Sequence, residues 1–122
     1  MKIPENHQRV MPYLILQDAR GFLKFAQNVF GAEIVTEHLD DENRVLHAEI
    51  KIGDSTIMIG QANEIWDAHN AGMFIYVADA DKTYQEALQN GADSILEMED
   101  KEYGRSGGIK DPFGNIWWIT SV

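Results

Sequence analysis

The same short arrangement of residues occurs twice in this 122-residue chain, and this repeat limits the folds that the chain can adopt. A strand-like apolar run ending in Asp-Ala precedes an amphipathic stretch ending in Gly-Ala, first at residues 10–32 and again at residues 73–92. The spacing is nearly kept, with 13 positions from Asp18 to Gly31 and 12 from Asp79 to Gly91. Each copy is too small to bury its apolar face alone, so the two copies are expected to be structural units that need a partner.

Apolar periodicity predicts one helix and four strands in each copy. The helices place apolar residues at the i, i+3, i+4 and i+7 spacing of a stripe that packs on a core. The stripe residues are Phe22, Phe25, Ala26 and Val29 in the first copy, and Ala80, Tyr84, Ala87 and Leu88 in the second. Aspartates 18 and 79 are suited to N-caps, and glycines 31 and 91 to left-handed C-caps.

The remaining residues complete a βαβββ order in both copies. Strands are expected at residues 10–17, 33–38, 44–52, 56–61, 73–78, 94–98, 107–110 and 116–122. The acidic runs 37–42 and 97–102 are interpreted as solvated turns. We therefore expect a single domain over residues 1–122, with a first unit at 9–61, a linker at 62–71 and a second unit at 72–122.

Composition excludes several classes of function. The absence of cysteine excludes disulfides, thiolate metal sites and cysteine nucleophiles. Twenty acidic residues against ten basic ones give a net charge of −10, which disfavours binding to nucleic acid. No run approaches the roughly 18 apolar residues of a membrane-spanning helix, and the N-terminus lacks the apolar core of a signal peptide. No membrane partner and a cytoplasmic location are therefore expected.

Several short motifs resemble the vicinal oxygen chelate superfamily, which includes glyoxalase I, bleomycin-resistance proteins and extradiol dioxygenases. The chain is especially similar to the single-domain branch described as PhnB-like. The matching pieces are Pro12-Tyr13-Leu14 with Asp18-Ala19, Phe30-Gly31-Ala32-Glu33, His47-Ala48-Glu49 with Ile52-Gly53-Asp54-Ser55, Asn90-Gly91-Ala92, and Lys110-Asp111-Pro112-Phe113-Gly114-Asn115. The last turn, directly before a terminal aromatic strand, is the most specific of them.

This resemblance implies an α+β fold in which two tandem βαβββ units form a curved mixed sheet, paired into a barrel in a homodimer. Exposed sheet edges, which need a partner, give the same expectation of a homodimer. Members of the superfamily that bind a metal ion do so through His and Glu at four strand positions. The resemblance places these positions at Met11, Met58, Gly72 and Trp118.

None of these four residues suits a hard divalent ion. Thioether sulfur is a soft ligand, glycine has no side chain, and the indole nitrogen is only a donor. We therefore expect neither a metal ion nor another cofactor.

Strand alternation predicts what fills this region instead, because residues two apart point the same way. An apolar, aromatic cleft is predicted, with Met11, Tyr13, Met58, Phe74, Tyr76 and Trp118 as ligand contacts. The alternative is that these side chains fill the barrel and leave no cavity. Gln61 and Trp66 are candidates to cover one end, although Trp66 also suits an interface. Arg105, expected before the seventh strand, is a candidate partner for an anionic ligand group or for a surface ion pair.

His47 and Glu49 alternate with apolar residues on the third predicted strand and are expected to face the cleft. An imidazole beside a carboxylate can act as an acid–base pair, although such pairs also occur as solvated strand residues. Two functions stay open. The favoured one is a metal-free protein that binds or sequesters a small organic ligand, similar to bleomycin-resistance proteins. The other is a glyoxalase-type lyase or isomerase with His47 and Glu49 in proton transfer.

Overall fold

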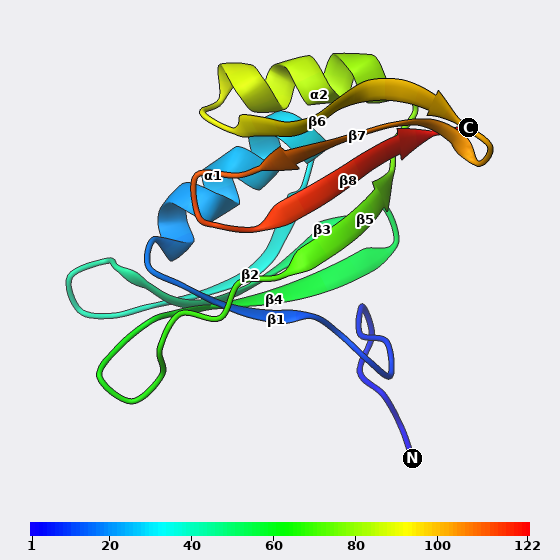
Figure 1. Ribbon diagram of the computed structural model, residues 1–122. Coiled ribbons are helices and arrows are strands. Elements are labelled where there is room, and N and C mark those ends of the chain that lie inside the picture. Colours follow the sequence, from blue (N-terminus) through cyan, green and yellow to red (C-terminus); the bar gives the residue numbers. More distant parts are fainter. The chain divides into compact units, whose positions relative to one another are not determined.

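The computed structural model describes residues 1–122, which divide into two compact units: residues 1–27 with 31–69, and residues 28–30 with 70–122. The elements in chain order are β1 (Tyr13–Leu16), α1 (Ala19–Phe30), β2 (Glu33–Leu39), β3 (Val45–Ile52), β4 (Ser55–Gln61), β5 (Gly72–Tyr76), α2 (Ala80–Gln89), β6 (Asp93–Lys101), β7 (Gly104–Lys110) and β8 (Ile116–Ser121) (Figure 1). The predicted βαβββ order therefore occurs twice.

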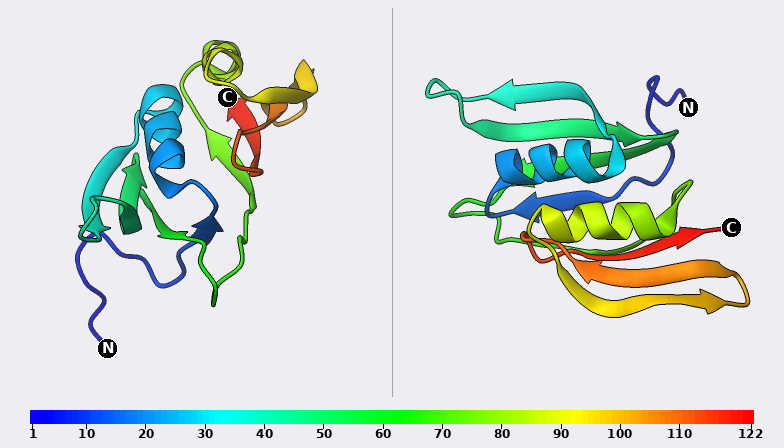
Figure 2. Two further views of the ribbon diagram at one scale, coloured as in Figure 1. Left: turned by 90° about the vertical axis from the view of Figure 1, so that its left-hand side faces the viewer. Right: turned by 90° about the horizontal axis from the view of Figure 1, so that it is seen from above.

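Each unit contains one four-stranded mixed sheet. The strand order is β1-β4-β3-β2 in the first sheet and β5-β8-β7-β6 in the second. In both sheets the first strand pairs in parallel with the fourth, whereas the other pairs are antiparallel. Each sheet has the helix of its own unit along one face (Figure 2). The α+β fold class is confirmed, and neither helix has the length and apolar character needed to span a membrane.

Caps and apolar stripes fix both helices as predicted. At the start of α1, the Asp18 carboxylate accepts a hydrogen bond of 2.9 Å from the Gly21 amide, and Gly31 ends the helix at a φ of 66°. Asp79 caps α2 through the Lys82 amide, and the chain leaves this helix through Asn90 and Gly91, whose φ is 98°. The α1 stripe is fully buried, while Ala80, Tyr84 and Ala87 are the buried residues of α2.

The turn at residues 111–115 is held by one buried carboxylate. Asp111 is only 3% exposed and accepts hydrogen bonds of 2.9 Å from the Phe113 amide, the Asn115 amide and side chain, and the Trp117 indole. The Asn115 side chain in turn accepts a bond from the Ala71 amide. The most specific sequence motif therefore has a structural role, because all its polar groups serve to connect β7, β8 and the start of β5.

Several predicted strand boundaries were wrong. Strand β6 runs through most of the acidic stretch 97–102, and β7 starts at Gly104, so that Arg105 lies within this strand. Antiparallel pairing of Asp100 with Arg105 explains the difference, since a strand pair tolerates alternate charged residues on its exposed face. The two strands also approach each other closely: a Cβ at Gly107 would collide with the Met98 sulfur and lie 3.0 Å from the Leu96 carbonyl oxygen.

Strand β1 is shorter than predicted because it begins after Pro12. The Pro12 carbonyl accepts a hydrogen bond of 3.0 Å from the Met58 amide, but proline has no amide to donate in return. Met11 therefore lies before the strand, half-buried.

Candidate functional site

One face of the first sheet, the face opposite the buried core, carries most of the candidate residues of this unit. Tyr13 on β1 pairs with Met58 on β4, which pairs with Glu49 on β3. Paired residues on neighbouring strands point to the same side, so these three side chains form a row across the sheet. Their neighbours Leu14, Ala48 and Ile59 point the other way and are fully buried. The sheet thus separates an apolar core from a face that is open to ligands.

Polar groups on this face form a connected array. The Tyr13 hydroxyl lies 3.1 Å from Nδ1 of His47, and Nε2 of the same ring lies 3.9 Å from the Glu49 carboxylate. The other Glu49 oxygen lies 2.7 Å from Nε2 of His7. His38 packs beside His47 with ring centroids 5.7 Å apart. His47 and Glu49 therefore share the face of Tyr13 and Met58. The polar groups follow one another across it in the order Tyr13, His47, Glu49 and His7.

The contacts within this array orient the His47 ring. When the Tyr13 hydroxyl donates to Nδ1 of His47, the other ring nitrogen carries the proton and faces Glu49. The separation of 3.9 Å is too long for a direct hydrogen bond but leaves room for a bridging polar atom. His47 is thus oriented by the phenol at one nitrogen and exposed to a carboxylate at the other.

Gly60 allows Tyr13 to reach His47. This glycine lies on β4 between Ile15 and His47, its partners on the two adjacent strands. A Cβ at position 60 would lie 3.1 Å from the Ile15 side chain and 3.2 Å from the Tyr13 ring. The absence of a side chain at this point therefore lets Tyr13 lie across β4 toward β3.

His7 was missed by sequence reasoning, because 42 positions separate it from Glu49 and no pattern links them. The N-terminal segment is held against this face by further hydrogen bonds. The Gln8 side chain donates to the Thr56 carbonyl at 3.0 Å, the Thr56 hydroxyl donates to the Asn6 carbonyl, and the Lys51 ammonium donates to the Asn6 side chain. Residues 6–8 thus cover the end of the face next to Glu49.

A cavity of about 470 Å³ opens on the other side of Tyr13. Its lining residues are Tyr13, Ile15, Trp66 and His69, all from the first unit. A backbone bridge between Ile15 and His69 brings the segment after β4 alongside β1. Trp66, one of the two residues expected to cover a cleft, lines this cavity. Gln61 instead uses its side-chain amide to bond the Ala19 amide and the Gln17 carbonyl at the start of α1.

The second sheet presents an aromatic face. Phe74 on β5 pairs with Trp118 on β8, and Tyr76 pairs with Thr120. Phe74 and Tyr76 meet edge to face with ring centroids 5.2 Å apart, and Tyr103 lies 6.1 Å from Phe74. Gly72 leaves space for the Trp118 indole, which a Cβ at position 72 would meet at 3.0 Å. The second unit contains no histidine, and the charged groups beside Trp118 are Glu97, Glu99 and Lys101, which line a small cavity with it.

Arg105 is engaged in ion pairs on the surface of the second unit. Its guanidinium lies 3.2 Å from the Asp81 carboxylate and 3.4 Å from that of Asp100. The hydrogen bond to Asp81 raises the pKa of Arg105 above its ordinary value. An anionic ligand at Arg105 would have to compete with both carboxylates.

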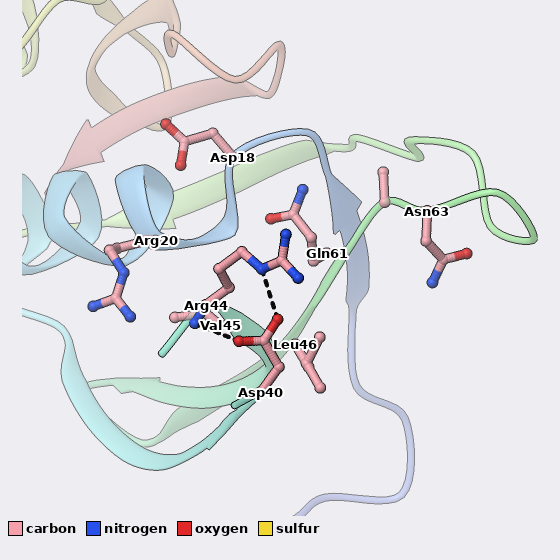
Figure 3. Close-up of a pocket in the computed structure, with 9 residues that line it drawn as sticks. Asp18, Arg20, Asp40, Arg44, Val45, Leu46, Gln61 and Asn63 are labelled. Atoms are coloured by element: carbon pink, nitrogen blue, oxygen red, sulfur yellow. Dashed lines mark hydrogen bonds and ion pairs between the residues drawn. The ribbon is translucent and has the colours of Figure 1, made fainter. Parts of the chain in front are cut away.

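A second cavity of about 470 Å³ lies where α1 begins and β2 turns into β3 (Figure 3). The Arg44 guanidinium lies 2.6 Å from the Asp40 carboxylate, and Arg20 donates to the Asn43 carbonyl. The Arg44 amide, which donates to the same carboxylate, lowers the pKa of Asp40, and the Arg44 side chain adds to this effect. Since its charged groups already have partners, this cavity is a weaker candidate than the one beside Tyr13.

The residues at the positions expected for metal ligands do not fit a metal ion. The first unit supplies only the thioethers of Met11 and Met58, and the second supplies Gly72 and the Trp118 indole. Nowhere in the structure do three or more His, Asp or Glu side chains come together in an arrangement that could hold a metal. Hard divalent ions need oxygen or imidazole ligands, so these positions cannot provide a catalytic metal centre.

The fold of two βαβββ units is consistent with the family to which the sequence is similar. Residues 8–119 match the model of the Glyoxalase/Bleomycin resistance protein/Dioxygenase superfamily. The chain belongs to this superfamily. The uncharacterized protein Mb0911c of Mycobacterium bovis is 27% identical over 118 residues, which cover 87% of this chain and 78% of that protein.

Solved structures of the superfamily share the fold. TioX from Micromonospora sp. ML1 has a TM-score of 0.76 at 20% identity, covering 94% of this chain and 96% of TioX. The PhnB protein from Bacillus cereus has a TM-score of 0.72 at 18% identity, covering 94% of this chain and all of PhnB. The bleomycin-binding protein of Streptomyces verticillus, solved with copper(II)-bleomycin, has a TM-score of 0.63 at 21% identity, covering 95% and 97% of the two chains. At these identities the likeness establishes the fold, while function depends on the side chains of each member.

Proposed function

We propose that this superfamily member binds or sequesters a small hydrophobic or aromatic molecule without a metal ion, as bleomycin-resistance proteins do with their ligands. The observation that carries the proposal is the exposure of large aromatic side chains on the ligand faces of both sheets. Tyr13 is 50% exposed, Phe74 49%, Tyr76 65% and Trp118 36%. Aromatic rings contribute large contact areas and specific stacking geometries, and contiguous exposed groups of them mark binding surfaces.

The other proposed contacts support an apolar ligand. Met11 and Met58 contribute flexible, polarizable side chains that adapt to ligand shape. Arg105 remains a proposed contact only for a ligand whose anionic group can replace Asp81 or Asp100. The bleomycin-binding protein, solved with copper(II)-bleomycin, is an example of this fold holding a small organic ligand.

We also propose that the partner of the chain is a second copy of itself. Strands β2 and β6 each end their sheet with one unpaired edge, and the aromatic faces described above are exposed in the single chain. A homodimer would cover part of this surface. Light scattering coupled to size-exclusion chromatography should give twice the chain mass of 13.8 kDa, and a monomer at all concentrations would contradict the homodimer.

The proposed function is tested by metal analysis together with a ligand screen. The purified protein should contain no stoichiometric divalent metal, and aromatic amphiphiles should raise its melting temperature equally with and without EDTA. Stoichiometric zinc, nickel or iron that is required for stabilisation by the ligand would contradict the proposal.

The array of Tyr13, His47, Glu49 and His7 favours a second candidate function. A glyoxalase-type lyase or isomerase could use His47 to move a proton, with the Tyr13 hydroxyl orienting one ring nitrogen and Glu49 facing the other. In this case hemithioacetal substrates should turn over in the presence of EDTA, and His47→Ala should abolish the reaction. Turnover that is unchanged in His47→Ala and Glu49→Gln would exclude this mechanism.

A further inference from the structure

We propose that the cavity between β1 and the segment 62–69 is a binding site for a flat aromatic cation. This inference rests on the proposed function of small-molecule binding and specifies a ligand class for the first unit. The site lies entirely within that unit and uses Trp66 and His69 in addition to Tyr13 and Ile15.

The segment that forms the outer wall is held in place by its own hydrogen bonds. Its turn is closed by the Asn63 side chain, which accepts bonds of 2.8 and 2.9 Å from the Ile65 and Trp66 amides, while the Asn63 amide donates to the Trp66 carbonyl. The segment is tied to β1 at both ends: the Ala62 amide donates to Leu16, and His69 exchanges bonds of 2.7 and 3.0 Å with Ile15. A wall fixed in this way presents a preformed site, which lowers the entropy lost on binding.

The cavity suits a planar ligand of two or three fused rings. Its volume of about 470 Å³ lies within the range of small-molecule sites. Trp66 is 61% exposed although it is among the largest apolar side chains, and Tyr13 and Ile15 contribute a second ring and an aliphatic surface. Among the four lining residues the polar group for a ligand is the His69 imidazole, since the Tyr13 hydroxyl contacts His47. A ligand would therefore gain mainly from stacking on the indole and the phenol ring.

Charge around the cavity favours a cation. Glu64 and Asp67 flank Trp66 in sequence, and residues 52–81 contain no lysine or arginine. The whole chain carries a net charge of −10, which favours a cationic over an anionic ligand. Cations bind to the faces of Trp and Tyr rings, and neighbouring carboxylates strengthen this attraction.

The test compares two three-ring dyes, proflavine and acridine, at a mildly alkaline pH where proflavine is a cation and acridine is neutral. Titration followed by dye fluorescence should show saturable binding that is tighter for proflavine. Trp66→Ala should weaken proflavine binding by a factor of about ten, because it removes both the stacking surface and the cation–π contact. The double variant Glu64→Gln, Asp67→Asn should remove most of the preference for proflavine over acridine.

The control is Ile65→Ala in the same segment, which removes an 82% exposed side chain that does not line the cavity and should leave proflavine binding unchanged. Since the Trp66 side chain is largely exposed, Trp66→Ala should retain the wild-type circular dichroism spectrum and melting temperature. Absence of saturable proflavine binding, or binding that is insensitive to Trp66→Ala, would overturn the inference. Dye binding lost only in Trp118→Ala would overturn it as well, while leaving the proposed function of the aromatic faces standing.

Discussion

Individual glycines determine where the largest aromatic side chains of the candidate site lie. Gly60 lets the Tyr13 ring cross β4 toward His47, and Gly72 leaves space for the Trp118 indole. Both glycines lie in strands, where a missing side chain normally weakens packing. At these two positions a neighbouring aromatic ring occupies the space that a Cβ would fill. A residue of low strand propensity therefore shapes the candidate site.

The substitution Gly60→Ala tests this role. Its Cβ would lie 3.1 to 3.2 Å from Ile15 and Tyr13, so these side chains have to shift, which should disturb the contact between the Tyr13 hydroxyl and His47. We expect a loss of stability of about 1–2 kcal/mol, typical of inserting a methyl group into a packed site. Gly60→Ala should weaken ligand binding about as much as Tyr13→Phe, a variant that removes the hydroxyl but keeps the ring. Urea unfolding and ligand titration measure the two effects, and a variant with unchanged ligand affinity would contradict the positioning role of Gly60.

Asp111 is the residue on which the second unit depends most for its polar interactions. Replacing it by Asn keeps the shape but places an amide group where four donors now point, so we expect a loss of about 3 kcal/mol of unfolding free energy. The matched control is Asp93→Asn on the exposed side of β6, which should change stability by less than about 0.5 kcal/mol. Equal stability of the two variants would show that the 111–115 turn is not held by its carboxylate.

At the scale of elements, the sheets and helices follow from local rules, whereas the edges of the glycine-rich strands follow from packing. Asp18, Asp79 and the apolar stripes predict both helices because caps and periodicity act within a few residues. The start of β7 at Gly104 was not predictable in this way. Gly107 and Gly108 are required by the approach of β6, whereas Gly104 is required by its φ of 136° and by the nearby Ser121 carbonyl. The candidate site was predictable only in part. Strand alternation places His47 and Glu49 on one face, but the contribution of His7 depends on a contact with no local signature.

The hairpin between β2 and β3 gives a prediction about pH. Hydrogen bonds from Arg44 lower the pKa of the Asp40 carboxyl, so the folded protein holds this proton less tightly than the unfolded chain. The stabilisation from Asp40 is therefore present at neutral pH and is lost as the pH falls through the folded-state pKa. Carbon-detected NMR titration should show a midpoint for Asp40 below that of an ordinary aspartate. In Arg44→Ala the midpoint should move only part of the way toward the ordinary value, because the residue 44 amide still donates to the carboxylate. An unchanged midpoint would show that the guanidinium does not contribute to the lowered pKa of Asp40.

At the scale of the whole molecule, the two βαβββ units carry different side chains on the exposed faces of their sheets. The first sheet combines Tyr13 and Met58 with an imidazole–carboxylate array, and the second carries Phe74, Tyr76 and Trp118. At the four positions expected for metal ligands, neither unit has an oxygen or imidazole ligand suited to a divalent metal. This difference from a metal-binding site is the basis of the proposal that the chain holds aromatic molecules.

The central claim, metal-independent binding of an aromatic ligand, is tested most directly by one titration. Metal-stripped protein in EDTA is titrated with the aromatic amphiphile that stabilises it best in the thermal screen, and intrinsic tryptophan fluorescence is followed for the wild type and Trp118→Ala. We predict saturable quenching in the wild type, an affinity unchanged by added zinc or nickel, and binding weakened by a factor of about ten in Trp118→Ala. Binding that appears only after a divalent metal is added would contradict the claim.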